Sequence, residues 1–144
     1  MMKRKTTLEL KFVLVDDPGL HIFVKAKING KVANLLVDTG ASKTVLDLNR
    51  IEKFAQGANM IKNEELSTGL GTTTMQSHSI ILNKIQFGDV VIKNETSYLI
   101  DLSHVNNAYE LLGLKPFDGV LGGDLLARFS AQIDYGKRIL VLKS

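Results

Sequence analysis

The sequence predicts a mainly β protein, a small β-barrel or β-sandwich that carries two or three short helices. Apolar runs of strand length recur along the chain, and some of them alternate in polarity. Turn signals such as Asn29-Gly30, Gly88-Asp89 and Gly136-Lys137 separate these runs. With 144 residues, of which 44% are hydrophobic, the chain can bury a sizeable core. We therefore expect a single domain over residues 1–144.

The N-terminal part is expected to form a strand followed by a tight hairpin. Apolar residues at every second position from Leu8 to Leu14 predict a half-buried strand. Alternation resumes from Ile22 to Ile28, and Asn29-Gly30 then leads into a return run over residues 31–37. Asn-Gly between two such runs predicts a two-residue hairpin, because both turn positions need a positive φ. Asp38 is therefore expected at the far end of the second arm.

Further short strands and helices are expected along the rest of the chain. Strands are predicted at residues 44–46, 80–82, 85–87, 90–92, 97–100, 133–135 and 139–142, with one more that ends at Gly122. Helices are predicted from Asp47 to about Gln56, from Ser103 to Leu112 and from about Asp124, each with the named polar residue as its cap. The inward residues are expected to be Ile51, Phe54 and Ala55 in the first helix, and Val105, Ala108, Tyr109 and Leu112 in the second.

The segment from Leu35 to Ser42 places an acidic residue directly after an apolar run. Its sequence, Leu-Leu-Val-Asp-Thr-Gly-Ala-Ser, predicts a buried strand, a carboxylate at Asp38 and a sharp turn at Gly40. A carboxylate at the end of a buried strand is costly unless it is hydrogen-bonded or used. Thr39, Ser42 and nearby backbone N–H groups could supply hydrogen bonds. The alternative is an Asx-turn that merely ends the strand.

A second glycine-containing segment, Thr68-Gly69-Leu70-Gly71, is followed by three threonines. A phosphate-binding loop would need more glycines and a following helix, whereas strand-like residues follow here. The segment is therefore expected to be the tip of a hairpin.

Charge and composition argue against several classes of protein. The formal net charge of +3 is too small to favour a nucleic-acid partner. There is no cysteine, and the scattered His21, His78 and His104 lack metal-ligand spacing, so we expect neither a metal nor another cofactor. No apolar run approaches transmembrane length or forms a signal-peptide core. We therefore expect no membrane association and a cytoplasmic location.

In their order, these segments resemble the retropepsin-like family of single-lobed aspartic proteases, which carry one Asp-Thr-Gly. The matching parts are a hairpin leading into Leu36–Ser42, the flap-like Gly69-Leu70-Gly71, and the late Val120–Leu126 block with its apolar-apolar-Gly. They cover roughly residues 21–142. The resemblance implies a small closed β-barrel of the retropepsin-like acid protease type. The resemblance also implies that the protein is an aspartic peptidase.

The same resemblance implies a role for each residue of the motif. Asp38 would be the catalytic carboxylate, Thr39 would hydrogen-bond across a twofold axis, and Gly40 would let the substrate backbone approach. Ala41 and Ser42, together with Thr68, Gly69, Leu70 and Gly71, would bind an extended peptide substrate. Many retropepsins pair an Asp with an Arg at the positions held here by Ser42 and Gly123, so the implied dimer lacks this ion pair.

Peptide hydrolysis by this route needs two carboxylates that share one proton, and one Asp38 cannot supply both. A twofold homodimer would provide the second copy. Within one chain the only rival is Asp118, for which a turn before a strand is the simpler interpretation. Asp134 is expected at a strand-to-turn corner. The sequence thus predicts a homodimeric aspartic endopeptidase. The alternative is a catalytically inactive barrel of the same fold that binds peptides or partners.

Overall fold

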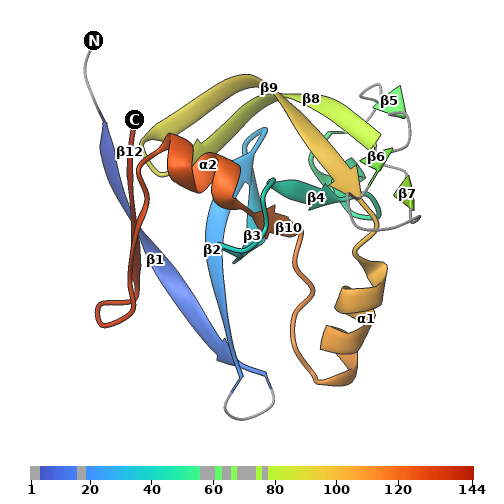
Figure 1. Cartoon of the computed structure of the whole chain (residues 1–144), viewed down its shortest axis with the longest axis horizontal. Helices are drawn as coiled ribbons and strands as arrows, with labels where there is room; N and C mark the ends of the chain where they lie inside the picture. Colours follow the sequence, from blue (N-terminus) through green and yellow to red (C-terminus); the bar gives the residue numbers. More distant parts are fainter. Residues whose placement is uncertain (1–3, 16–18, 56–60, 63–65, 68–73, 76–77) are drawn as a thin grey trace.

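The structure is a computed structural model of the whole chain, and it describes residues 4–15, 19–55, 61–62, 66–67, 74–75 and 78–144. Its centre is a closed barrel of six strands in the order β2-β3-β10-β4-β9-β8. The barrel closes where Lys27 and Ile28 of β2 pair with Gln86 and Ile85 of β8. The expected fold class, a mainly β closed barrel with short helices, is confirmed (Figure 1).

The elements around and within the barrel have the following bounds. The barrel strands are β2 (Leu20–Ile28), β3 (Lys31–Val37), β4 (Val45–Asp47), β8 (His78–Phe87), β9 (Val90–Ile100) and β10 (Gly119–Leu121). The other strands are β1 (Lys5–Leu14), β5 (Ile61–Lys62), β6 (Leu66–Ser67), β7 (Thr74–Met75), β11 (Gln132–Asp134) and β12 (Ile139–Lys143). The helices are α1 (Ser103–Leu111), α2 (Gly123–Arg128) and the 3₁₀ turn η1 (Ile51–Lys53).

The β2–β3 hairpin forms as the Asn-Gly signal predicted. Asn29 has φ 49° and Gly30 has φ 83°, so both turn residues lie in the left-handed region. The strands continue in register from Ile28↔Lys31 to Phe23↔Leu36. Residues at alternating positions, such as Val24 and Ala33, point into the barrel and are almost fully buried.

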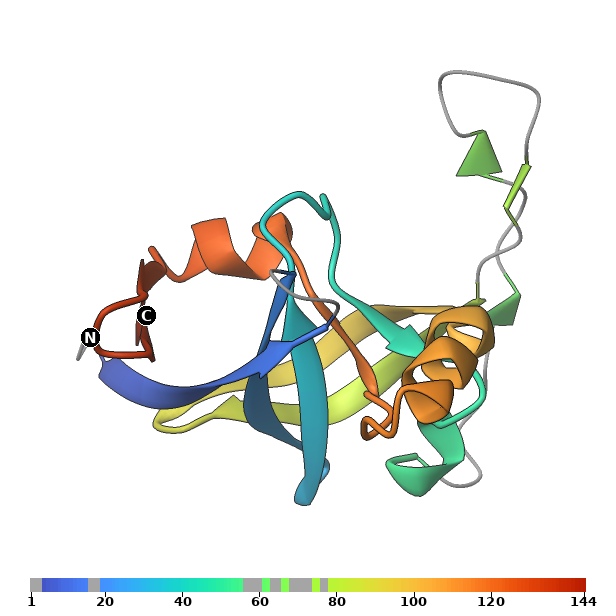
Figure 2. The same cartoon turned by 90° about the horizontal axis from the view of Figure 1, so that it is seen from below.

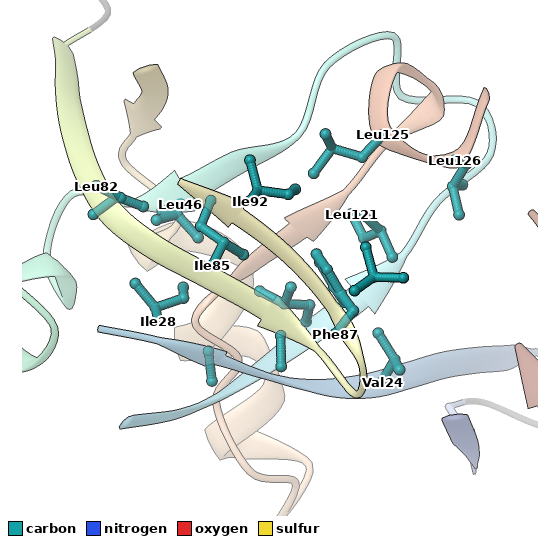
Figure 3. Close-up of a cluster of buried hydrophobic side chains, with 14 of the residues drawn as sticks. Val24, Ile28, Leu46, Leu82, Ile85, Phe87, Ile92, Leu121, Leu125 and Leu126 are labelled. Carbon is teal, nitrogen blue, oxygen red and sulfur yellow. The ribbon is translucent and has the colours of Figure 1, made fainter. Parts of the chain in front are cut away.

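A continuous cluster of buried aliphatic side chains fills the barrel interior, and Phe54, Phe87 and Phe129 belong to the same cluster; Figure 3 shows Phe87 among its aliphatic neighbours. They come from every barrel strand and from α2, which closes one end with Leu125 and Leu126. Burial of this continuous apolar cluster is the main stabilising contribution of the fold.

Four of the predicted strands are too short, because they form two longer strands. Residues 80–82 and 85–87 belong to the single strand β8, and residues 90–92 and 97–100 belong to β9. The intervening polar residues were interpreted as breaks, but the ladder continues through Leu82↔Glu95 and Lys84↔Lys93. Side chains on the outer face of a barrel strand can be polar without interrupting its backbone hydrogen bonds.

The helix predicted from Asp47 to about Gln56 is wrong. Asp47 ends β4, its N–H donates to the Asp118 carbonyl at 2.8 Å, and within the described residues 47–55 the helical part is the short turn η1 alone. Ile51 and Phe54 are nevertheless buried, as expected. The tertiary contacts of Asp47 thus hold the backbone in the sheet at the position where a cap was predicted.

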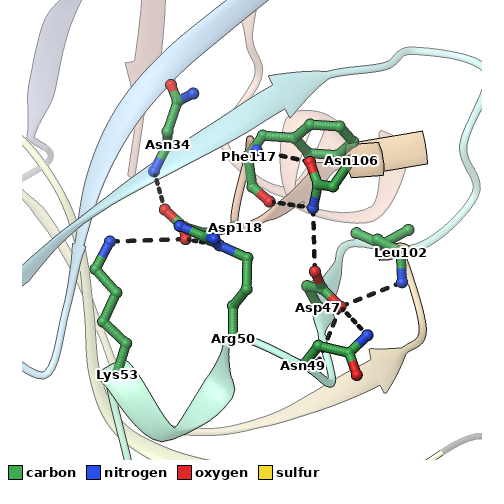
Figure 4. Close-up of polar contacts among 9 residues, drawn as sticks. All are labelled: Asn34, Asp47, Asn49, Arg50, Lys53, Leu102, Asn106, Phe117 and Asp118. Atoms are coloured by element: carbon green, nitrogen blue, oxygen red, sulfur yellow. Dashed lines mark hydrogen bonds and ion pairs between the residues drawn. The ribbon is translucent and has the colours of Figure 1, made fainter. Parts of the chain in front are cut away.

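Those contacts form a buried polar network between residues far apart in the sequence, which no local sequence pattern predicts (Figure 4). The Asp47 carboxylate accepts hydrogen bonds from the Leu102 N–H at 3.2 Å and from the Asn106 side chain at 3.1 Å. Asn106 also donates to the Phe117 carbonyl and accepts from its N–H. Of the face predicted for α1 only Tyr109 is buried, while Asn106 takes the second inward position. The helix is thus fixed to the barrel through polar as well as apolar contacts.

The two ends of the chain pair with each other. β1 runs antiparallel to β12 from Lys5↔Lys143 to Glu9↔Ile139, and β12 also pairs with β11. The Ser144 N–H donates to the carbonyl of Arg4, the first described residue, at 2.8 Å, and Figures 1 and 2 show β1 and β12 side by side next to the barrel. The second half of β1 joins the barrel through β2. The terminal strands β1 and β12 thus pair with each other within one chain.

Candidate active site

Asp38 directly follows strand β3 and lies at one end of the barrel. Val37 is the last residue of the strand, and the Asp38 N–H donates to the Leu121 carbonyl of β10 at 3.0 Å. The side chain of Asp38 is exposed. The carboxylate therefore lies at the far end of the second hairpin arm, as predicted, and it is open to solvent rather than enclosed.

The turn after Asp38 orients one of its two carboxylate oxygens. The Gly40 N–H donates to Asp38 Oδ1 at 2.9 Å, and the Ala41 N–H donates to the Asp38 carbonyl at 3.2 Å. This local geometry is that of an Asx-turn. Oδ2 accepts no hydrogen bond from any residue that the structure describes. A Cβ on Gly40 would lie 3.3 Å from Asp38 Oδ1, so a side chain there would crowd the carboxylate.

The neighbouring motif residues lie beside Asp38. Thr39, Gly40 and Ser42 are exposed, and Ala41 is half-buried. The four other residues expected to bind substrate, Thr68, Gly69, Leu70 and Gly71, lie outside the described residues. The strands on either side of them, β6 and β7, pair antiparallel through Leu66↔Met75 and Ser67↔Thr74, as the arms of a hairpin would.

The loop that carries Asp38 is fastened to the start of α2. The Gly123 N–H donates to the Ala41 carbonyl at 2.7 Å, and the Gly122 N–H donates to Thr44 Oγ1 at 2.9 Å. A Cβ on Gly122 would come within 2.7 Å of the Lys43 backbone, so only glycine permits this approach. One backbone–backbone hydrogen bond and one from backbone to side chain therefore join the two segments beside Ser42 and Gly123.

Asp124 completes this attachment. Its Oδ1 accepts from the Thr44 hydroxyl at 2.7 Å, from the Thr44 N–H at 2.9 Å and from the Leu125 N–H at 2.8 Å. Asp124 was predicted to cap α2, but Gly122 is the cap residue and Asp124 lies in the first turn of the helix. No local signal connects Asp124 with Thr44, because 80 residues separate them in sequence.

Asp118 lies at the other end of the same strands. β3 and β10 are parallel, with Gly119↔Leu35 and Leu121↔Val37 in register, so Asp118 adjoins Asn34 at their beginning. Its Oδ2 accepts the Asn34 N–H at 2.8 Å. Asp38 follows Asn34 by four residues, which is about 13 Å along an extended strand. Asp118 therefore lies too far away to share a proton with Asp38 of the same chain.

Asp118 is instead part of an ion-pair cluster (Figure 4). It is 3% exposed, and its Oδ1 lies 2.7 Å from Arg50 Nε and 3.7 Å from Lys53 Nζ.

Asp134 lies at a strand-to-turn corner, as expected, and its Oδ1 accepts the Lys137 N–H. Within the described ranges, no three His, Cys, Asp or Glu side chains are grouped as metal ligands. None of the helices among the described residues is long and apolar enough to cross a membrane.

Comparison with protein families places residues 24–125 in the family described as aspartyl protease. This match covers the hairpin from Val24 onward, the Asp38 loop and the beginning of α2. No curated protein matches the chain.

Several solved structures share the fold. A retropepsin-like aspartic protease from Rickettsia conorii is 22% identical, with a TM-score of 0.57 over 99% of this chain and 90% of that chain. The retroviral protease-like domain of Ddi1 from Leishmania major is 17% identical, with a TM-score of 0.55 over 83% and 86%. EIAV protease in complex with the inhibitor HBY-793 is 19% identical, with a TM-score of 0.57 over 85% and 99%.

Proposed function

This chain belongs to the aspartyl protease family and has its retropepsin-like fold, and from this premise we propose that it is an aspartic endopeptidase. We propose further that its active site forms between two copies of the chain, each of which contributes one Asp38. The protein would then hydrolyse peptide bonds as a homodimer whose two Asp-Thr-Gly loops meet at a twofold axis.

The position of the carboxylates is the observation that supports this proposal. Asp38 is exposed, and Oδ2 has no partner among the described residues, so it is available to a second chain and to water. The rival within the chain, Asp118, is buried at the opposite end of the paired strands β3 and β10. One chain therefore presents half of a carboxylate pair.

In the proposed dimer the two Asp38 carboxylates hold one proton between them, because two adjacent negative charges repel. The ionised carboxylate takes a proton from a water, which attacks the scissile carbonyl carbon. The protonated carboxylate donates to the carbonyl oxygen, and a proton is then returned to the leaving amine. No cofactor takes part in this sequence of proton transfers.

The remaining motif residues would position the loop and the substrate. Thr39 would hydrogen-bond across the twofold axis, and Gly40 would leave room for the substrate backbone beside the carboxylate. Ala41 and Ser42, with residues 68–71, would bind a peptide or protein substrate in an extended conformation. Backbone pairing of this kind recognises a strand more than a particular side chain.

The test is to mix wild-type chains with an excess of Asp38→Asn chains under conditions of proven subunit exchange. Asp38→Asn alone should be folded and inactive on a susceptible peptide. With a tenfold excess of the variant, random pairing leaves wild-type chains paired with each other about one time in ten, so wild-type activity should fall to about a tenth.

Asp89→Asn is the matched control, because Asp89 is an exposed acid in the β8–β9 turn. An excess of this variant should leave the wild-type activity undiminished. If wild-type and Asp38→Asn chains exchange partners but the activity stays proportional to the number of wild-type chains, the shared active site is contradicted. A wild-type dimer that binds peptides without cleaving them would favour the alternative of an inactive binding barrel.

A further inference from the structure

A second candidate site lies on the outer face of the β1–β2–β3 sheet. The register puts Lys11 opposite Phe23 and Lys25 opposite Asn34, so these side chains lie on one face. Phe23 is covered by Tyr109 of α1 and by Phe117, which form a small apolar cluster outside the barrel. Beside this cluster the face opens into a cavity of about 710 Å³.

The lining of this cavity is strongly basic. Five basic side chains and a single acidic one line it: Lys11, Lys25, Arg50, Lys53, Lys115 and Asp118. Asp118 pairs with Arg50 and Lys53, so one carboxylate meets two cations. Lys11, Lys25 and Lys115 form no ion pair with any described residue. The cavity therefore has an excess of positive charge and favours an anion.

Arg50 is held in a manner that suits anion binding (Figure 4). Its Nε donates to the buried Asp118 carboxylate at 2.7 Å, and Asp118 is itself held by the Asn34 N–H at 2.8 Å. Among the described residues, neither terminal guanidinium nitrogen of Arg50 has a hydrogen-bond partner. A guanidinium that is anchored through Nε keeps two N–H₂ groups for a carboxylate or phosphate.

The rest of the lining is apolar. Val13, Phe23, Leu114 and Pro116 line the cavity together with the ring of Tyr109. A cavity of this volume, with apolar walls and a few converging polar groups, is typical of small-molecule sites. The walls would take an apolar or aromatic body, while the cations bind its charged group.

We propose that this basic cavity binds a small organic anion that has an apolar or aromatic body and a phosphate or carboxylate group. The site is separate from the candidate active site, because Asn34 and Asp118 lie at the opposite end of the paired strands from Asp38. It shares β3 and β10 with the Asp38 loop, but none of the active-site residues lines it.

The test uses 8-anilinonaphthalene-1-sulfonate, an aromatic anion that fluoresces in apolar surroundings, and the neutral N-phenyl-1-naphthylamine as its uncharged counterpart. The wild-type protein should bind the anion at one site per chain and the neutral probe much more weakly. The double variant Lys11→Gln/Lys25→Gln should weaken anion binding about tenfold, because it removes two unpaired cations from the lining. Both side chains are exposed, so the fold should be retained.

Lys93→Gln is the matched control, since Lys93 is an exposed lysine of β9 that does not line the cavity. It should bind the anion as the wild type does. Displacement of the probe by phenyl phosphate alone would assign a phosphate-bearing ligand, and displacement by benzoate alone a carboxylate-bearing one. Equal binding of the neutral probe, or unchanged anion binding by the double variant, would overturn the proposal.

Discussion

At the scale of single residues, the carboxylates of this chain differ in what surrounds them rather than in their chemistry. Asp38 is exposed and receives one local hydrogen bond, from the Gly40 N–H. Asp118 is buried and paired with Arg50 and Lys53. Oδ2 of the exposed Asp38 has no partner among the described residues, whereas removing the Asp118 charge would leave the cations beside it without their buried partner. This contrast can be tested with one substitution.

Asp118→Asn should lower the free energy of unfolding by about 2 kcal/mol and leave peptidase activity intact. Removing one partner of a buried pair costs about 3–5 kcal/mol, but Arg50 and Lys53 are 31% and 49% exposed, so solvent screens part of the loss. Urea unfolding and peptide cleavage would measure the two effects, with Asp89→Asn as an exposed control. A folded Asp118→Asn protein without activity would mean that Asp118 belongs to the catalytic site.

Tyr109 gives the fold a pH dependence at the alkaline end. Its side chain is 3% exposed and contacts His21 Nδ1, and burial raises the pKa of the Tyr109 phenol above its usual value of 10.0. Between the unfolded and folded pKa values the folded state therefore binds more protons than the unfolded state. The free energy of unfolding therefore falls as the pH rises above about 10, and it levels off once the pH exceeds the folded-state pKa of Tyr109.

Tyr109→Phe should remove this alkaline loss. The variant should be about 1 kcal/mol less stable at neutral pH, because it lacks the hydrogen bond to His21. Its deficit relative to the wild type should shrink as the pH rises above 10. Urea unfolding from pH 8 to 11 measures this difference, and Tyr135→Phe, at an exposed tyrosine, should show no such convergence. A deficit that stays constant with pH would contradict the assignment.

At the scale of elements, α1 shows how a polar residue can fix a helix. The apolar positions predicted to face inward include Val105 and Leu112, which are 39% and 53% exposed. Asn106 is buried instead and joins Asp47 to the backbone of Phe117. Asn106 forms hydrogen bonds with both the N–H and the carbonyl of Phe117. We therefore expect the loss of Asn106 to destabilise the segment before β10 more than the loss of an apolar contact would.

Asn106→Ala should therefore destabilise the protein by about 2–3 kcal/mol, because it removes the hydrogen bonds that Asn106 forms with the N–H and carbonyl of Phe117 and with Oδ2 of Asp47. Asn107→Ala is the matched control, since Asn107 is the next residue of the same helix and is exposed. Thermal or urea unfolding of both variants gives the comparison. Similar small losses for the two would show that the buried network contributes little.

At the scale of the whole molecule, the barrel is complete in one chain and the proposed active site is not. The β2–β8 pairing closes the barrel, and the pairing of β1 with β12 brings the two ends together. In the described part of the chain, β11 is the edge of the terminal sheet. Because β1 and β12 already pair with each other, the proposed dimer would not need their facing edges for contacts between the two chains. The proposed dimer also lacks an Asp–Arg pair, because Ser42 and Gly123 stand at those positions.

A dimer without that ion pair should dissociate on dilution. Peptidase activity per chain should fall as the protein concentration drops through the dissociation constant of the dimer, because a single chain holds one Asp38. Sedimentation velocity over the same concentrations should show the matching change from dimer to monomer. Activity per chain that stays constant while the protein becomes monomeric would refute the shared site.

The sequence by itself determined the local features of this protein. The Asn29-Gly30 turn, the strand leading to Asp38 and the aspartic protease motif depend on residues adjacent in the chain, where backbone sterics and apolar periodicity act directly. The strand and turn pattern predicted a small β-barrel or β-sandwich, and the resemblance to the retropepsin-like family implied the closed barrel that the structure has.

Only the tertiary structure decided how distant polar groups meet. Three hydrogen-bonded pairs join residues far apart in the sequence: Thr44 and Asp124 are 80 residues apart, Asn106 and Asp47 are 59 apart, and Arg50 and Asp118 are 68 apart. No local sequence pattern identifies any of these pairs. Whether an acid is exposed, as Asp38 is, or buried and paired, as Asp118 is, depends on which strands lie side by side. The physical reason is that hydrogen bonds and charge pairs act over a few ångströms in space, which the chain reaches only after the barrel has closed.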